Sequence, residues 1–142
     1  MDHASRQQWL GAVILAGVLY PVVGIASAAL AGAAASQQMQ FFWRLSAFGV
    51  SGVVLAAHVA YEHFRLRNSA LVTAWHASLG AAIGGFLLAL MANMHDMGSA
   101  SGYRPRMLVA LIAWPLLTGV PAFCVAVVLA AVLGLKRRPR AN

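Results

Sequence analysis

The chain has 142 residues, of which 61% are hydrophobic and only 9% are charged. About a quarter of the residues in soluble globular domains are charged, so this composition excludes a soluble domain and indicates a membrane protein. The formal net charge is +7, but the basic residues stand at the ends of apolar runs and do not form a patch that would bind nucleic acid. The single cysteine, Cys124, supplies neither a disulfide nor a zinc cluster.

Four apolar runs predict an all-α fold, a polytopic membrane protein with four transmembrane helices in an antiparallel bundle. A hydrocarbon core of about 30 Å needs roughly 20 apolar residues in a helix, and each run is long enough. The first run also exceeds the roughly 7–15-residue core of a signal peptide, so we interpret it as a retained span. A single transmembrane domain over residues 1–142 is expected, with helices at about 9–35, 41–63, 70–94 and 106–135 and a basic tail at 136–142.

The distribution of Lys and Arg predicts the orientation, because loops on the cytoplasmic side of a membrane are enriched in these residues. One side of the four-span arrangement carries Arg6, Arg65, Arg67, Lys136, Arg137, Arg138 and Arg140, and the other carries Arg44, Arg104 and Arg106. We therefore expect a multi-pass protein of the cytoplasmic (inner) membrane with both the N and the C terminus in the cytoplasm.

Polar residues concentrate between positions 44 and 96, which hold four of the five histidines and two of the three acids. In the second predicted helix, Arg44, Ser51 and His58 recur every seven residues and Glu62 lies one turn beyond His58, so the four form one stripe. An ionisable group that faces lipid costs at least about 2.5–3.5 kcal/mol near the midplane. The stripe is therefore expected to face inward, toward the third helix.

The third predicted helix carries His76, Gly80 and Gly84 at intervals of four residues. Counted from the basic turn at 1.5 Å per residue, His58 and His76 both lie roughly 10 Å into the membrane. Two imidazoles at one depth suggest axial ligands of a b-type haem, with Gly80 and Gly84 leaving space for the macrocycle. The candidate cofactor-binding residues are thus His58, His76, Gly80 and Gly84, and the haem-iron ligands are His58 and His76. The alternative is that both histidines are hydrogen-bonded bundle residues, His58 for example to Glu62 or Ser51.

Two further interpretations use the same polar residues. A histidine and a carboxylate one turn apart can share a metal ion, which suggests a cluster of His58, Glu62, His63 and His76, although His63 points about 100° away from Glu62 around the helix. Alternatively, Glu62, His58 and Arg44 would form a titratable path for a proton-coupled transporter.

Helix contacts are predicted from small residues and from charges at the helix ends. Gly17, Gly24 and Ala31 recur every seven residues in the first helix, which favours close approach of another helix. Such small-residue faces would serve the bundle itself, a membrane-protein partner or a homo-oligomer. At the other end of the second helix, Arg44 lies at the level of Asp96, so an ion pair between them is geometrically possible. The alternative is that the two charges are solvated separately at the membrane boundary.

No motif identifies a reaction, and no residue is proposed as catalytic. The expected function is that of a small, non-enzymatic integral membrane protein, surrounded by the lipid bilayer, which holds a small ligand or a b-type haem between the second and third helices. Two alternatives are an accessory subunit of a larger membrane complex and a small proton-coupled transporter.

Overall fold

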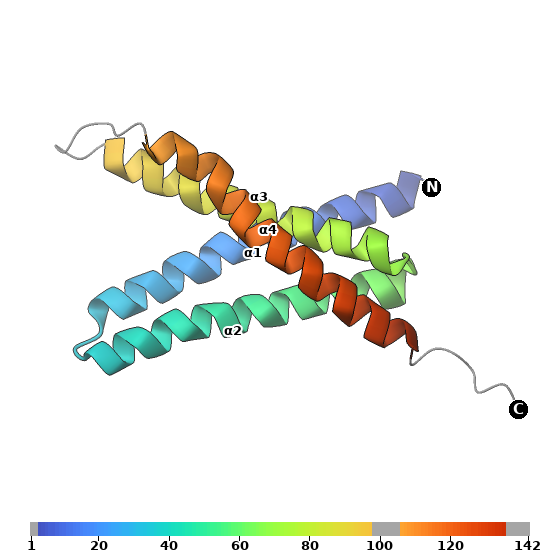
Figure 1. Ribbon diagram of the computed structural model, residues 1–142, viewed down its shortest axis with the longest axis horizontal. Helices are drawn as coiled ribbons and strands as arrows, with labels where there is room; N and C mark the ends of the chain where they lie inside the picture. Colours follow the sequence, from blue (N-terminus) through green and yellow to red (C-terminus); the bar gives the residue numbers. More distant parts are fainter. Residues whose placement is uncertain (1–2, 98–105, 136–142) are drawn as a thin grey trace, which may run out of the picture.

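The computed structural model describes residues 3–97 and 106–135 of the chain. Five helical elements follow one another in this part: α1 (His3–Ala33), α2 (Gln37–Tyr61), the π-helix η1 (Glu62–Leu66), α3 (Ala70–Met97) and α4 (Arg106–Leu135) (Figure 1). Four spans in the described part are long and apolar enough to cross a membrane. The predicted all-α fold with four membrane-spanning helices is confirmed.

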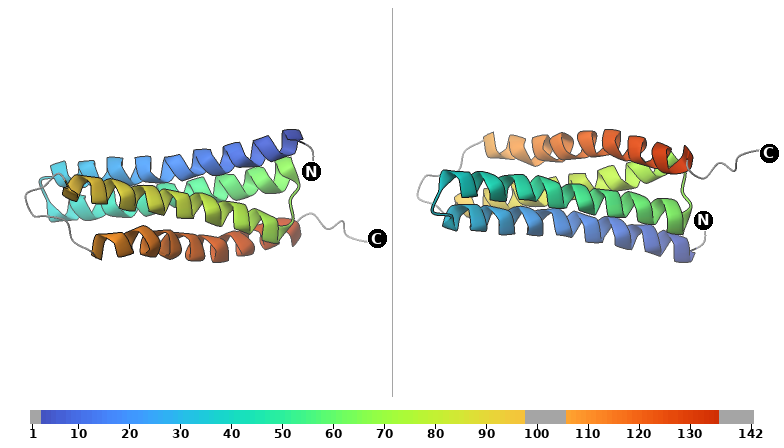
Figure 2. Two further views of the ribbon diagram at one scale, coloured as in Figure 1. Left: turned by 90° about the horizontal axis from the view of Figure 1, so that it is seen from above. Right: turned by 90° about the horizontal axis from the view of Figure 1, so that it is seen from below.

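The helices form an antiparallel bundle in which α3 is central. It packs against both α1 and α4, whereas α2 packs mainly on α1. Consecutive helices alternate in direction. The end of the bundle that contains η1 therefore also contains the first residues of α1 and α3 and the last residues of α4 (Figure 2). We call this the η1 end and the other the opposite end, where the turn between α1 and α2 lies.

Glycines allow α1 and α3 to approach closely. A Cβ built on Gly84 would lie 2.6 Å from Tyr20 Cβ, and one built on Gly17 would lie 2.8 Å from Ile83 Cγ2. A Cβ on Gly80 would meet Ala16 at 3.4 Å. Close van der Waals contact is what holds helices together in lipid, where the hydrophobic effect between them is absent. The small-residue face predicted around Gly17 therefore contacts α3.

Side-chain hydrogen bonds join α3 to α4. Ser78 Oγ donates to the carbonyl oxygen of Gly119 over 2.9 Å. The hydroxyl of Thr118 lies 3.1 Å from the carbonyl oxygen of Ala81 and 2.9 Å from that of Trp114, so its single proton has an acceptor on either helix. These bonds lie next to Pro115 and Pro121, both of which are inside a continuous α4.

The buried core lies in the half of the bundle nearer the η1 end. Most of its members are alanines, which let the helix axes come close; they are Leu55, Val59, Ala74, Ala77, Ala81, Ala122, Ala126 and Ala130. In the opposite half α2 contributes large exposed side chains, among them Phe41, Phe42 and Phe48. The end of α2 is therefore enclosed by α3 and α4, and its beginning is not.

Candidate functional site

The side chain of Glu62 is completely buried. It is the first residue of η1 and the only acid whose side chain belongs to the described part of the structure. Burying a carboxylate is costly unless charged or hydrogen-bonding partners surround it. The partners of Glu62 therefore define the site.

Three side chains converge on the carboxylate of Glu62. His76 Nδ1 lies 3.0 Å from each carboxylate oxygen, and Asn68 Nδ2 donates a hydrogen bond to Oε2. His58 Nε2 is 3.8 Å from Oε1, within ion-pair distance but beyond a hydrogen bond. The carboxylate thus links the end of α2, the turn after η1 and the start of α3.

The π-helix and the turn that follows it position this network. Arg67 has φ 54° and is the only described non-glycine residue with a positive φ; a left-handed residue of this kind costs roughly 1–2 kcal/mol. In this conformation its backbone N–H donates to the carbonyl oxygen of Glu62, as does that of Asn68 over 3.4 Å. Glu62 is therefore tied to the turn through both its backbone and its side chain. Single π-turns of this kind often mark functional positions.

The ring of His76 is held from α1. It stacks on Trp9 with ring centroids 4.4 Å apart and an angle of 6° between the planes. Since His76 Nδ1 faces Glu62, the imidazole is fixed both in its plane and at its edge. Trp9 Nε1 is buried and has no hydrogen-bond partner in the described part of the chain.

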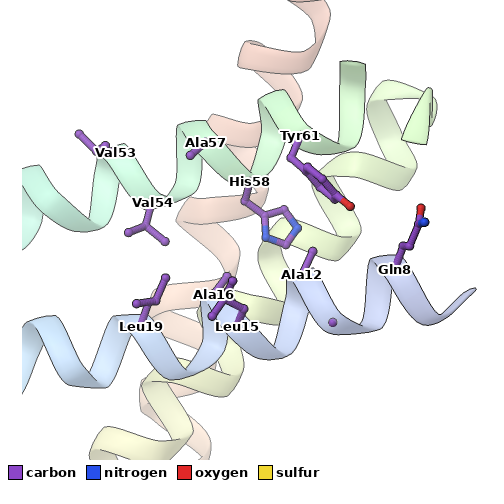
Figure 3. A pocket seen from close by; sticks show the side chains of 11 residues that line it. Gln8, Ala12, Leu15, Ala16, Leu19, Val53, Val54, Ala57, His58 and Tyr61 are labelled. Carbon is purple, nitrogen blue, oxygen red and sulfur yellow. The ribbon is translucent and has the colours of Figure 1, made fainter. Parts of the chain in front are cut away.

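The imidazole of His58 is 6% exposed and its Nε2 has no hydrogen-bond partner among the described residues. It lies on the wall of a cavity of about 560 Å³ between α1 and α2, and Figure 3 shows the ring projecting from α2 toward α1. Several lining residues are also exposed on the outer surface of the bundle, so the cavity opens toward the surrounding lipid. It is lined by Gln8, Gly11, Ala12, Leu15, Ala16, Leu19, Val53, Val54, Ala57, His58 and Tyr61.

The predicted polar stripe turns inward only at the η1 end. His58 and Glu62 are buried, Ser51 is half-buried and Arg44 is exposed, so the four side chains do not form a continuous internal path. Asp96, the predicted ion-pair partner of Arg44, has a side chain outside the described residues.

The residues of the suggested metal cluster are only partly brought together. His58 and His76 reach the carboxylate of Glu62, but His63 packs edge-on against Phe64, and neither of its nitrogens has a hydrogen-bond partner within the described segments. No group of three or more His, Cys, Asp or Glu residues in these segments is arranged to hold a metal ion.

The arrangement does not fit a haem held by His58 and His76 between α2 and α3. Two axial imidazoles must approach the iron from opposite faces of a flat macrocycle, whereas these two rings approach the same carboxylate. His76 does not line the cavity beside His58. Gly80 and Gly84 face Ala16 and Tyr20 of α1, where a close helix contact takes up the space.

No protein-family model, curated protein or solved structure matches the chain. Two members of the site were also missed by the sequence patterns. Asn68 follows Glu62 by six residues, beyond the reach of one regular helical turn. Trp9 lies in another helix, and no periodicity in α1 relates it to His76.

Proposed function

We propose that the protein is a component of the cytoplasmic membrane that holds a small lipophilic ligand in the cavity between α1 and α2, with His58 as the polar contact. The observation that supports this is a buried imidazole on the wall of an otherwise largely apolar cavity of about 560 Å³. Ligand sites are typically apolar concavities of about 300–1,000 Å³ with a few polar groups. The proposed ligand site lies on the α1 side of α2, whereas the sequence analysis expected a ligand between the second and third helices.

The buried network gives His58 a fixed environment. Glu62 is held by His76 and Asn68, and its carboxylate lies 3.8 Å from His58 Nε2. When the surroundings of the ring are rigid, the side chain loses less conformational entropy on binding a ligand than a mobile side chain would. The role of the network in this proposal is to position the polar contact.

Filling the cavity tests this function. A Cβ on Gly11 would meet no atom within 4 Å, so Gly11→Leu should enter the cavity without disturbing the helices. Gly49→Leu is the matched control, because a Cβ there also meets nothing within 4 Å and Gly49 does not line this cavity. Small molecules extracted from purified protein in nanodiscs would be quantified by mass spectrometry.

We expect wild type and Gly49→Leu to carry an enriched lipophilic molecule that Gly11→Leu has lost. Identical extracts from the three proteins would contradict ligand binding in this cavity. An accessory subunit of a larger membrane complex would then be the better hypothesis, and co-purification in mild detergent would be the next measurement.

The proposal also includes the orientation, with the η1 end in the cytoplasm. Arg65 and Arg67 lie at this end, and α1 begins and α4 ends there (Figure 2), so the excess of basic residues should hold it inside. A green fluorescent protein fused after Asn142 should fluoresce, while alkaline phosphatase at the same position should be inactive. An active phosphatase would reverse the orientation.

A further inference from the structure

The cavity between α1 and α2 changes in polarity along its length. Its polar lining residues, Gln8, His58 and Tyr61, lie toward the η1 end, and Leu19 and Val53 line the part nearest the middle of the bundle (Figure 3). An occupant that matches both parts has a polar head at the level of the membrane boundary and an apolar tail directed toward the bilayer centre. That is the orientation of a lipid-soluble molecule in one leaflet.

The charges at the polar end favour an uncharged head group. None of the described residues that line the cavity is Lys or Arg, and the carboxylate of Glu62 lies behind His58 at 3.8 Å. A phosphate or carboxylate head placed beside His58 would be a second negative charge near Glu62, with no cation among the described lining residues, which is strongly unfavourable at a buried site. Phospholipids and ionised fatty acids are therefore poor occupants.

The hydrogen-bonding groups favour a head that donates. A carboxylate only accepts hydrogen bonds, so Glu62 favours the tautomer of neutral His58 that carries its proton on Nε2, the nitrogen facing it. The other nitrogen, Nδ1, is then an acceptor. A hydroxyl group satisfies this acceptor, whereas a ketone or an ester does not.

The small residues at the polar end leave room for a ring. The residues that line the cavity around His58 include Gly11, Ala12 and Ala57, whose small side chains leave room between the two helices. Tyr61 of α2 and Gln8 of α1, which line the same end of the cavity (Figure 3), can each both donate and accept hydrogen bonds. Farther in, branched apolar side chains line a path for a hydrocarbon tail.

From these features we propose that the ligand is an isoprenoid hydroquinone, a ring with two hydroxyl groups on a branched apolar chain. This rests on the proposed function. One hydroxyl donates to His58, and the second lies toward Tyr61 and Gln8. The inference concerns binding alone and assigns no electron transfer to the protein.

The test uses the full chain in nanodiscs of synthetic phosphatidylcholine, with ubiquinol-2 as the probe under anaerobic conditions. Nanodiscs are captured through a tag on the protein, and the retained ubiquinol-2 is measured by chromatography with electrochemical detection against empty nanodiscs.

We expect saturable retention by wild type and Gly49→Leu and only background retention by Gly11→Leu. His58→Leu should weaken retention by about tenfold, the effect of losing one hydrogen bond. Oxidised ubiquinone-2 should bind more weakly than ubiquinol-2, because its carbonyls only accept.

Several outcomes would overturn this inference. Equal retention by wild type, His58→Leu and Gly11→Leu would mean that the probe partitions into lipid and not into the cavity. If His58→Leu does not fold, the comparison of ubiquinol-2 with ubiquinone-2 tests the same hydrogen bond, and equal retention of the two would refute it. Ala57→Leu, which fills the cavity from an exposed position on α2, then serves as a second variant beside Gly11→Leu. An enriched lipophilic molecule in the wild-type extract without retention of ubiquinol-2 would refute the quinol class but leave the proposed function intact. Absence of both would refute both.

Discussion

The two halves of α2 carry residues of the same predicted stripe but place them in different surroundings. At the η1 end, His58 and Glu62 are buried, the latter completely. At the opposite end, Arg44 is exposed, and nearby Phe48 is 78% exposed. The difference arises because α3 and α4 enclose only the end of α2, through the alanine-rich core. Periodicity therefore identified one face of a helix, but neighbouring helices decided which part of that face is internal.

The two halves of α2 should differ in how much a substitution lowers the free energy of unfolding, and the largest loss is expected from Glu62→Ala. Removing the carboxylate leaves His76 and Asn68 without their acceptor in a buried site, and breaking such an interaction typically lowers the free energy of unfolding by about 3–5 kcal/mol. Arg44→Ala, at the opposite end, should change it by less than about 0.5 kcal/mol. Thermal unfolding in detergent, followed by circular dichroism, measures both.

Glu62→Gln refines this comparison. The amide keeps the size of the side chain but replaces one acceptor with a donor that faces His76 or Asn68, so an intermediate loss of stability is expected. Equal effects of Glu62→Ala and Arg44→Ala would contradict the distinction between the two ends.

A smaller effect is expected where α1 contacts α3. In Gly84→Val the new Cβ would lie 2.6 Å from Tyr20 Cβ, and overpacking of this kind usually costs about 1–3 kcal/mol. Gly49→Val is the control, since a Cβ there meets nothing within 4 Å. The difference in thermal midpoint between the two variants reports the contact. Equal midpoints would show that the helices separate at little cost.

Neither the wild-type protein nor the variants His58→Ala and His76→Ala are expected to show the visible absorption of a haem protein. Because both imidazoles face Glu62, protein purified from haem-replete cells should lack the strong Soret band of a six-coordinate haem. Absorption spectra before and after reduction with dithionite measure this directly. Bands that sharpen on reduction and disappear in either variant would establish the haem interpretation and refute the arrangement around Glu62.

The positions of the spans could be predicted from the sequence because hydropathy is a local property. The predicted range 106–135 coincides with α4, and α3 begins at Ala70 as predicted. The first two helices begin earlier than predicted, at His3 and Gln37, and the second continues into η1, since apolar content does not distinguish an α-turn from a π-turn. Small residues spaced by four and seven also indicated where helices approach, because only small side chains permit close contact in lipid.

The composition of the site was decided by the tertiary structure. Glu62, His58 and His76 were all candidates, but their convergence on one carboxylate, the stack of Trp9 on His76 and the cavity on the α1 side of α2 were not predicted. All four spans consist largely of Ala, Val, Leu and Gly, so composition alone does not determine which faces pair. That choice depends on how individual side chains fit across helices, and a few small residues such as Gly17 and Gly84 decide it by allowing α1 to lie against α3.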